Sequence, residues 1–150
     1  MTEKEKKYAL VAKQAAALID INAGDIANYA NICALLHGEF GFWWTGVYLV
    51  KEDHLELGPF QGPVACTRIP FGKGVCGTAW KENRSVVVPD VDAFPGHIAC
   101  SSESRSEIVV PLRKGGIITG VLDIDSKNYA AFDEIDAAWL ERICGLFDRD

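Results

Sequence analysis

The segment Ile108-Val-Val-Pro-Leu-Arg-Lys-Gly-Gly-Ile-Ile-Thr-Gly-Val-Leu-Asp-Ile-Asp125 predicts a β-hairpin. Its two halves, Ile108–Arg113 and Ile117–Asp125, are rich in the β-branched residues that favour strands. The sequence Lys114-Gly115-Gly116 between them is typical of a hairpin turn, because glycine accepts the backbone angles that such turns require. Strands joined by short hairpins are antiparallel, so the segment predicts an antiparallel sheet.

Around this hairpin the chain alternates between strand and helix patterns. Further strands are expected at Trp43–Val50, Leu55–Phe60, Val64–Ile69 and Val86–Pro89. Helices are expected over residues 4–20, 26–38 and 75–83 and after Asp133, with Asp25 and Asp133 as N-caps of the second and the last helix. The order α-α-β-β-β-α-β-β-β-α predicts an α+β domain with a mainly antiparallel sheet and helices packed on one face.

The composition limits the function classes. A chain of 150 residues is expected to form one domain, residues 1–150, with its own core. The formal net charge of −6 argues against a nucleic-acid ligand, which requires a basic surface. No apolar run approaches the roughly 18 residues of a membrane span. The N-terminus has no signal-peptide pattern, so the cytoplasm is the expected location.

The sequence contains five cysteines, an odd number that does not suit a permanent disulfide framework in a cytoplasmic protein. It has no Cys-x-x-Cys and no His-x-x-x-His pair, so no structural zinc site is expected. Cys33 and Cys144 fall on or beside apolar helix faces and are expected to pack in the core. Cys66, Cys76 and Cys100 are the candidates for redox chemistry.

Cys100 lies in the middle of a polar loop, Phe94–Glu107, that joins two predicted strands. His97 precedes it by three residues and Arg105 follows it by five. An accessible thiol near positive charge favours the thiolate, whereas packing cysteines are buried and inert. The setting therefore predicts that Cys100 is a nucleophile.

Cys76 is expected in the first turn of a helix, directly after Gly72-Lys73-Gly74. The helix dipole and the lysine of that turn would both favour the Cys76 thiolate. A loop thiol and a helix-start thiol can form a transient disulfide if their Cα atoms lie about 4.4–6.8 Å apart. The alternative is that Cys66, Cys76 and Cys100 are all incidental to function.

Acidic side chains converge at one end of the predicted sheet. Asp123 and Asp125 alternate with apolar residues and therefore point to the same face, and Glu107 begins the neighbouring strand. Clustered acids are costly unless they are solvated, protonated or paired with a cationic ligand. The acids indicate either a site for a cationic group or an ordinary solvated strand end.

Two aromatic residues, Trp44 and Tyr48, share one face of an earlier strand by the same alternation. Gly46 between them has no side chain and would leave room for a ligand against the strand. The pair predicts the walls of a pocket, with ordinary sheet packing as the alternative.

Eight motifs spread over nearly the whole chain carry a resemblance to a known family. They are Trp43-Trp-Thr-Gly-Val-Tyr48, Leu57-Gly-Pro-Phe-Gln-Gly62, Ala65-Cys-Thr-Arg-Ile69, Gly72-Lys-Gly-Val-Cys-Gly-Thr-Ala79, Val88-Pro-Asp-Val91, Phe94-Pro-Gly-His-Ile-Ala-Cys100, Ser106-Glu-Ile-Val-Val-Pro111 and Gly120-Val-Leu-Asp-Ile-Asp-Ser126. Together they resemble the free methionine-(R)-sulfoxide reductases, which are built on a GAF domain. The resemblance implies one GAF-like α+β domain, with a six-stranded, mainly antiparallel sheet, helices on one face and a ligand pocket on the other.

The same resemblance implies roles for the residues named above. Cys100 matches the family's catalytic cysteine, Cys76 its resolving cysteine, and Cys66 a third cysteine that can join disulfide exchange. Three acids match those that bind substrate and polarise the sulfoxide, and two aromatic residues match the pocket around the methyl-thio end: Glu107, Asp123, Asp125, Trp44 and Tyr48. Ser101 departs from the family, which usually has Asp directly after the catalytic cysteine, so the activity could be reduced.

The implied function is reduction of free L-methionine-(R)-sulfoxide by thiol chemistry, with no metal and no organic cofactor. Cys100 would attack the sulfoxide sulfur and become a sulfenic acid, Cys76 would condense with it to a disulfide, and a thioredoxin-type reductant would restore both thiols. The first and last helices could supply a homodimer face. The alternatives are a non-catalytic GAF sensor of small molecules, which has no use for these two thiols, and an oligomerisation module, which leaves the polar loop unexplained.

Overall fold

The computed structural model describes residues 1–98 and 103–149. Its centre is a six-stranded antiparallel sheet with the order β3-β2-β1-β6-β5-β4. The strands are β1 (Trp44–Lys51), β2 (His54–Gln61), β3 (Arg68–Pro70), β4 (Val86–Val88), β5 (Ser106–Lys114) and β6 (Ile117–Ser126). The helices are α1 (Glu3–Leu18), α2 (Asp25–Phe40), α3 (Gly74–Glu82) and α4 (Glu134–Gly145), with a short 3₁₀ helix η1 (Val91–Ala93).

The predicted hairpin is confirmed as the β5–β6 pair, in which Lys114 lies opposite Ile117. The two residues of its turn, Gly115 and Gly116, have φ angles of 55° and 82°. Two consecutive positive φ angles define the turn type whose twist matches that of the flanking strands. The glycines set the pairing next to the turn, and an irregularity between Leu112 and Arg113 then shifts the pairing by one residue before the strands reach the acids.

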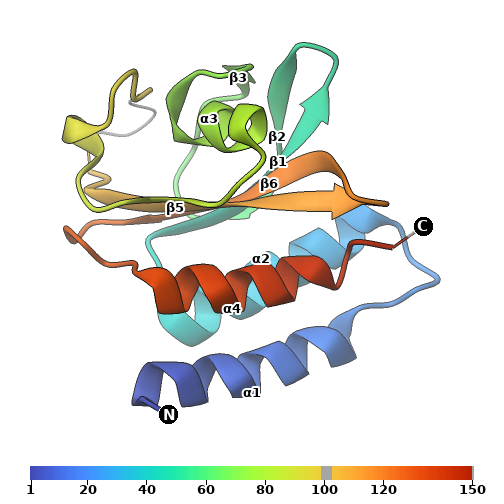
Figure 1. The fold of residues 1–150 in the computed structure, drawn as a ribbon. Helices are drawn as coiled ribbons and strands as arrows, with labels where there is room; N and C mark the ends of the chain where they lie inside the picture. Colours follow the sequence, from blue (N-terminus) through green and yellow to red (C-terminus); the bar gives the residue numbers. More distant parts are fainter. Residues whose placement is uncertain (99–102, 150) are drawn as a thin grey trace.

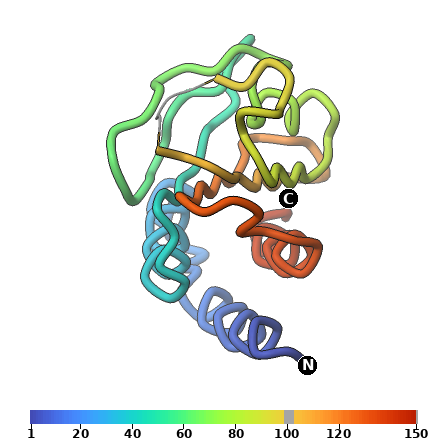
Figure 2. Tube along the Cα trace, turned by 90° about the vertical axis from the view of Figure 1, so that its left-hand side faces the viewer, coloured from blue at the N-terminus to red at the C-terminus, as the bar shows by residue number. Residues whose placement is uncertain are grey.

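The helices lie on both faces of the sheet in unequal numbers. Figure 1 shows α1, α2 and α4 on one face and α3 on the other. Figure 2 shows that α1 lies farthest from the sheet, below α2 and α4. The predicted α+β class is confirmed, but the expectation that the helices pack on one face is wrong for α3, which lies on the face that holds the pocket. None of the described helices is long and apolar enough to cross a membrane.

Strand alternation divides the side chains between two cores. On β5 and β6, Ile108, Val110, Leu122 and Ile124 pack into the core shared with α1, α2 and α4. Val109 and Val121 face the opposite way, into the smaller core below α3. Each fully buried aliphatic side chain contributes about 1.5–3 kcal/mol, so the register is strongly specified. The alternation sends Glu107, Asp123 and Asp125 to the α3 face.

The helix ends agree with the sequence in one case and differ in another. Asp133 is the N-cap of α4 as predicted, and its side chain accepts hydrogen bonds from the backbone N–H groups of Ile135 and Asp136. The predicted cap at Asp25 is wrong, because Gly24 is the N-cap and Asp25 is the first residue of α2. The Asp25 carboxylate instead accepts a hydrogen bond of 2.8 Å from Lys114 Nζ.

The strand predicted at Val64–Ile69 is also wrong in extent. Only Arg68–Pro70 forms β3, and Cys66 lies in the loop before it. The carbonyl group of Cys66 accepts a hydrogen bond from the Tyr48 hydroxyl instead of a ladder bond. A side chain from β1 thus competes with sheet pairing for the backbone of this segment.

Candidate active site

A cavity of about 50 Å³ lies between the sheet and the segments on its α3 face. Six of the eight predicted site residues line it: Trp44, Tyr48, Cys76, Glu107, Asp123 and Asp125. Cys66 is next to Ala65, which also lines it. Cys100 and Ser101 lie outside the described residues, as does the centre of the predicted loop.

Cross-strand register brings the acids and one aromatic residue together. Trp44 of β1 pairs with Asp125 of β6, and Asp125 pairs with Glu107 of β5. Two residues earlier on β6, Asp123 points to the same face of the sheet. It pairs with Gly46 of β1 on one side and with Val109 of β5 on the other. The predicted convergence of the three acids on one face is therefore confirmed.

Glu107 and Asp125 have carboxyl groups that resist ionisation. Glu107 is 6% exposed. Burial raises the pKa of Glu107 well above its ordinary value, and the neighbouring charges of Asp123 and Asp125 raise it further. Burial and Asp123 likewise raise the pKa of Asp125 well above its ordinary value. A protonated carboxyl group can donate a hydrogen bond to a ligand oxygen.

Asp123 takes the opposite role in this cluster. Burial raises the pKa of Asp123, and hydrogen bonding from Glu107 and Cys76 together with the nearby His97 partly offsets that effect. Its Oδ1 atom is buried and accepts no hydrogen bond from the described residues. An acceptor left without a donor in the interior is a candidate partner for a ligand group that donates hydrogen bonds.

The aromatic residues form one wall of the cavity. The rings of Trp44 and Tyr48 are stacked with centroids 6.0 Å apart, and the Trp44 ring also stacks on Phe60 at 5.3 Å. The prediction that Gly46 leaves room for a ligand is wrong in detail. A Cβ at Gly46 would overlap the Trp44 ring, so the missing side chain makes room for that ring.

The same two aromatic residues hold the loop that carries Cys66. Trp44 Nε1 donates a hydrogen bond of 2.9 Å to the carbonyl oxygen of Pro63. The Tyr48 hydroxyl donates one of 2.9 Å to the carbonyl oxygen of Cys66. The wall of the cavity and the position of Cys66 are therefore coupled.

The cysteines fall into different states. Cys66 is disulfide-bonded, whereas Cys33, Cys76 and Cys144 are free thiols. Cys33 and Cys144 lie in the core between the sheet and the helices, as predicted. Burial raises the pKa of Cys33 to about 12, so this thiol is inert at neutral pH.

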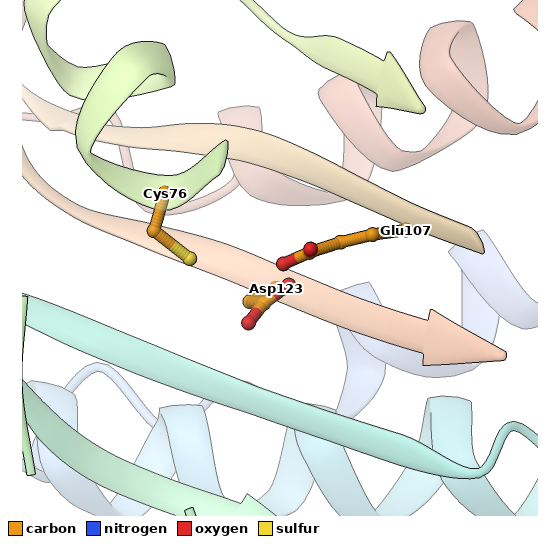
Figure 3. Close-up of side chains that lie close together, drawn as sticks. All are labelled: Cys76, Glu107 and Asp123. Atoms are coloured by element: carbon orange, nitrogen blue, oxygen red, sulfur yellow. The ribbon is translucent and has the colours of Figure 1, made fainter. Parts of the chain in front are cut away.

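Cys76 differs from its predicted setting. It lies in the first turn of α3, but it is buried and faces the acids. Burial, and then the charges of Asp123 and Glu107, raise the pKa of the Cys76 thiol well above its ordinary value. The expectation that the helix start and Lys73 favour its thiolate is therefore wrong. Its thiol instead joins Glu107 and Asp123 in the group shown in Figure 3, which is also the candidate site for a metal ion.

Two polar residues outside the predicted set also line the cavity. His97 Nε2 lies 3.9 Å from Glu107 Oε1. Ser104 Oγ donates a hydrogen bond of 3.4 Å to Asp125 Oδ1. Both belong to the polar loop around Cys100, so their position in that loop is the sequence feature that could have identified them.

The arrangement suits one kind of ligand. Acids on one side can hold a cationic group and donate to an oxygen, while the aromatic wall can contact an apolar end. A small zwitterion with a polarisable side chain has both features.

Comparison with known proteins agrees with this chemistry. The GAF domain family model matches residues 29–148. GAF domain-containing protein A of Dictyostelium discoideum is 53% identical over 97% of this chain and 92% of its own length. The free methionine-R-sulfoxide reductase of Escherichia coli is 42% identical over 97% of this chain and 89% of its own length.

A solved structure extends the likeness to three dimensions. It is the free methionine-R-sulfoxide reductase of Neisseria meningitidis in complex with its substrate. It is 51% identical, has a TM-score of 0.95, and the match covers 99% of this chain and 90% of that one. Since the family model matches most of the chain and the two named reductases align over nearly all of it, the chain belongs to the GAF-domain family of free methionine-R-sulfoxide reductases.

Proposed function

We propose that the protein reduces free L-methionine-(R)-sulfoxide to L-methionine with thiols as the source of electrons. The observation that carries the proposal is the likeness, over 99% of the chain, to the Neisseria meningitidis reductase solved with its substrate. The cavity supports it independently, because its acids and aromatic wall match the two ends of the substrate.

The acids bind the polar groups of the substrate, and the aromatic wall contacts its apolar end. Asp123, with a buried oxygen that accepts no hydrogen bond within the described chain, receives the substrate ammonium. Glu107 or Asp125, whose raised pKa values favour the protonated form, donates to the sulfoxide oxygen. Trp44 and Tyr48 contact the methyl-thio end. Protonation of the oxygen makes the sulfur electrophilic, so the acids activate as well as bind.

The proposed reduction of the sulfoxide has three steps. The Cys100 thiolate attacks the sulfoxide sulfur, the oxygen passes to Cys100 as a sulfenic acid, and methionine leaves. A second thiol attacks the sulfenic acid, which releases water and forms a disulfide. A dithiol reductant exchanges with that disulfide and restores both thiols. The net reaction oxidises one dithiol and reduces one sulfoxide to methionine and water.

We assign the second thiol to Cys66 and no longer to Cys76. Cys66 is disulfide-bonded in this structure, while Cys76 is a free thiol. The attacking species is the thiolate, and burial together with the surrounding acids disfavours that form of Cys76.

A thioredoxin-type protein is the proposed reductant, and the cytoplasm is the proposed location. Both follow from the need to reduce a protein disulfide in each turnover. A homodimer is also proposed, because α1 leaves Leu10 and Leu18 exposed at 58% and 42%. Sedimentation equilibrium at working concentration tests the dimer.

The experiment that tests the function uses racemic free methionine sulfoxide, dithiothreitol and the purified chain. The proposal expects consumption of half of the sulfoxide with matching release of methionine. A non-catalytic sensor would bind the compound and leave all of it unchanged. The Cys144→Ser variant is the control, because Cys144 lies in the helical core and should not affect the yield.

A further inference from the structure

Cys76, Glu107 and Asp123 form a compact group of metal-binding donors inside the cavity. They come from three elements, α3, β5 and β6, and Figure 3 shows their side chains converging. One donor atom from each lies within 4.8 Å of the other two. The three residues are 3%, 6% and 5% exposed. No local sequence motif announces this group, because its members are far apart along the chain.

A second observation points to a ligand for Asp123. Asp123 lines the cavity, and its Oδ1 is buried without a hydrogen-bond donor among the residues that the structure describes. A buried carboxylate oxygen without a partner is costly. The cavity of about 50 Å³ exceeds the roughly 10–15 Å³ that one water molecule occupies on this measure, so an ion and a water fit.

His97 offers a fourth donor on the Glu107 side of the group. His97 Nε2 is 3.9 Å from Glu107 Oε1, and His97 lines the same cavity. The complete set is one thiol sulfur, one imidazole nitrogen and two carboxylate oxygens. Zn–S bonds of about 2.3 Å and Zn–O bonds of about 2.0–2.2 Å place tetrahedral ligands about 3.6 Å apart. The donors of Cys76, Glu107 and Asp123, which lie within 4.8 Å of one another, therefore need to approach by about 1 Å to close around an ion.

We propose that Cys76, Glu107, Asp123 and His97 form a zinc-binding site inside the substrate cavity. A sulfur and nitrogen donor set favours Zn²⁺, whereas Mg²⁺ and Ca²⁺ prefer oxygen ligands alone. The positive charge would lie between two buried carboxylates and relieve their repulsion. Binding displaces the protons of the Cys76 thiol and of the Glu107 carboxyl group to solvent, because thiols and carboxyl groups that coordinate zinc are deprotonated.

The consequence is inhibition. The ion occupies the acids that would otherwise hold the substrate, so zinc and methionine sulfoxide exclude each other. This consequence rests on the proposed function, but the binding of zinc does not. The zinc-binding proposal and the proposed function can therefore fail separately, because zinc binding is measured without substrate.

The test uses the oxidised chain, in which Cys66 is held in its disulfide and Cys76 is free. Zn²⁺ is titrated by calorimetry, and Co²⁺ is added as a coloured substitute whose thiolate charge-transfer band reports a sulfur ligand. We expect one ion per chain and a charge-transfer band. Loss of an outer-shell partner alone typically costs 10–100-fold in metal affinity. Loss of the thiolate in Cys76→Ser should therefore weaken binding by at least about 100-fold and abolish the band.

Three comparisons keep the test decisive. Cys144→Ser, another buried thiol but in the helical core, should bind zinc like the parent. Asp123→Asn should bind more weakly while keeping the cobalt band, which separates loss of a ligand from loss of the fold. The proposal is overturned if the parent binds no ion, or if Cys76→Ser and Asp123→Asn bind zinc as tightly as the parent. Binding that appears only after reduction and persists in Cys76→Ser would also overturn it, because other thiols would then hold the ion.

Discussion

The Tyr48 hydroxyl donates a hydrogen bond of 2.9 Å to the carbonyl oxygen of Cys66. Tyr48 belongs to a rigid inner strand and Cys66 to a loop, so this bond transmits the position of the sheet to the cysteine. Tyr48 is 2% exposed, and its hydroxyl is thus a buried donor whose partner is fixed. Tyr48 therefore contributes both to the aromatic wall of the cavity and to the position of the loop that carries Cys66.

The variant Tyr48→Phe tests that connection. It removes the bond and keeps the ring, so we expect a loss of about 0.5–1.5 kcal/mol in the free energy of unfolding. In a chain of this length, 1 kcal/mol corresponds to a fall in Tm of about 2–4 °C. We also expect slower formation of the Cys66 disulfide during turnover, measured by quenched-flow alkylation.

Tyr8→Phe is the matched control for this variant. Tyr8 is a buried tyrosine in the core on the helical side of the sheet, and its hydroxyl donates a hydrogen bond of 2.6 Å to Asp136 Oδ1. Loss of that bond should lower Tm at least as much and leave the disulfide rate unchanged. Equal effects of both variants on that rate would mean that Tyr48 acts only through stability.

The raised pKa of Glu107 predicts how stability depends on pH. Unfolded Glu107 ionises near 4.5, whereas the folded group retains its proton to a higher pH. Between those two values the folded state binds more protons than the unfolded state, so stability falls as pH rises through the window. Glu107→Gln removes the effect and should be more stable than the parent at pH 8, with a smaller difference at pH 5.

Thermal unfolding at both pH values, with a chelator present, measures this difference. The exposed residue Glu39 provides the control, since Glu39→Gln should change stability by no more than about 0.5 kcal/mol at either pH. A Glu107→Gln variant that is less stable than the parent at pH 8 would show that the carboxylate is well paired there.

Substrate selectivity tests the role of the acids. A charge-assisted hydrogen bond contributes roughly 1.5–3 kcal/mol, which corresponds to a factor of about 10–100 in affinity. N-acetyl-methionine-(R)-sulfoxide has lost the ammonium, so its kcat/KM should be at least about tenfold lower than that of the free amino acid. The S epimer should be inert, because its oxygen points toward the Trp44 and Tyr48 wall. Equal kcat/KM values for the free and acetylated R forms would exclude ammonium recognition by these acids.

Strand periodicity predicts most of the site from the sequence. Period-two alternation puts Asp123 and Asp125 on one face, and the glycine turn at Gly115 and Gly116 predicts the hairpin that brings them beside the strand of Glu107. These features depend on neighbours in sequence or on one hairpin. For the same reason the cap at Asp133 was predicted correctly. The one-residue shift of pairing between Leu112 and Arg113 has no signal in the sequence.

The errors arose where distant contacts decide the outcome. The helix-start argument for Cys76 is local, whereas its thiol is buried against acids from β5 and β6. The strand predicted around Cys66 was lost to a hydrogen bond from Tyr48 on β1. The space over Gly46 was filled by the Trp44 ring. Each contact joins residues whose distance in space the sequence does not give.

A single turnover by fully reduced protein, from which the reductant has been removed, tests the roles of Cys100 and Cys66 most directly. The chain is mixed with excess free methionine-(R)-sulfoxide, released methionine is counted, and the disulfide is mapped after digestion with trypsin. Cleavage after Arg68 and Lys73 puts Cys66 and Cys76 on different peptides, so the mapping distinguishes them. Cys66→Ser and Cys76→Ser should both release the first equivalent of methionine, and only Cys66→Ser should fail in recycling by thioredoxin.

We expect one equivalent of methionine per chain and a disulfide between the peptides of Cys66 and Cys100. Cys100→Ser should release no methionine, because serine is a far weaker nucleophile. Methionine released at the parent rate by Cys100→Ser, or a disulfide on the Cys76 peptide, would contradict these roles of Cys100 and Cys66.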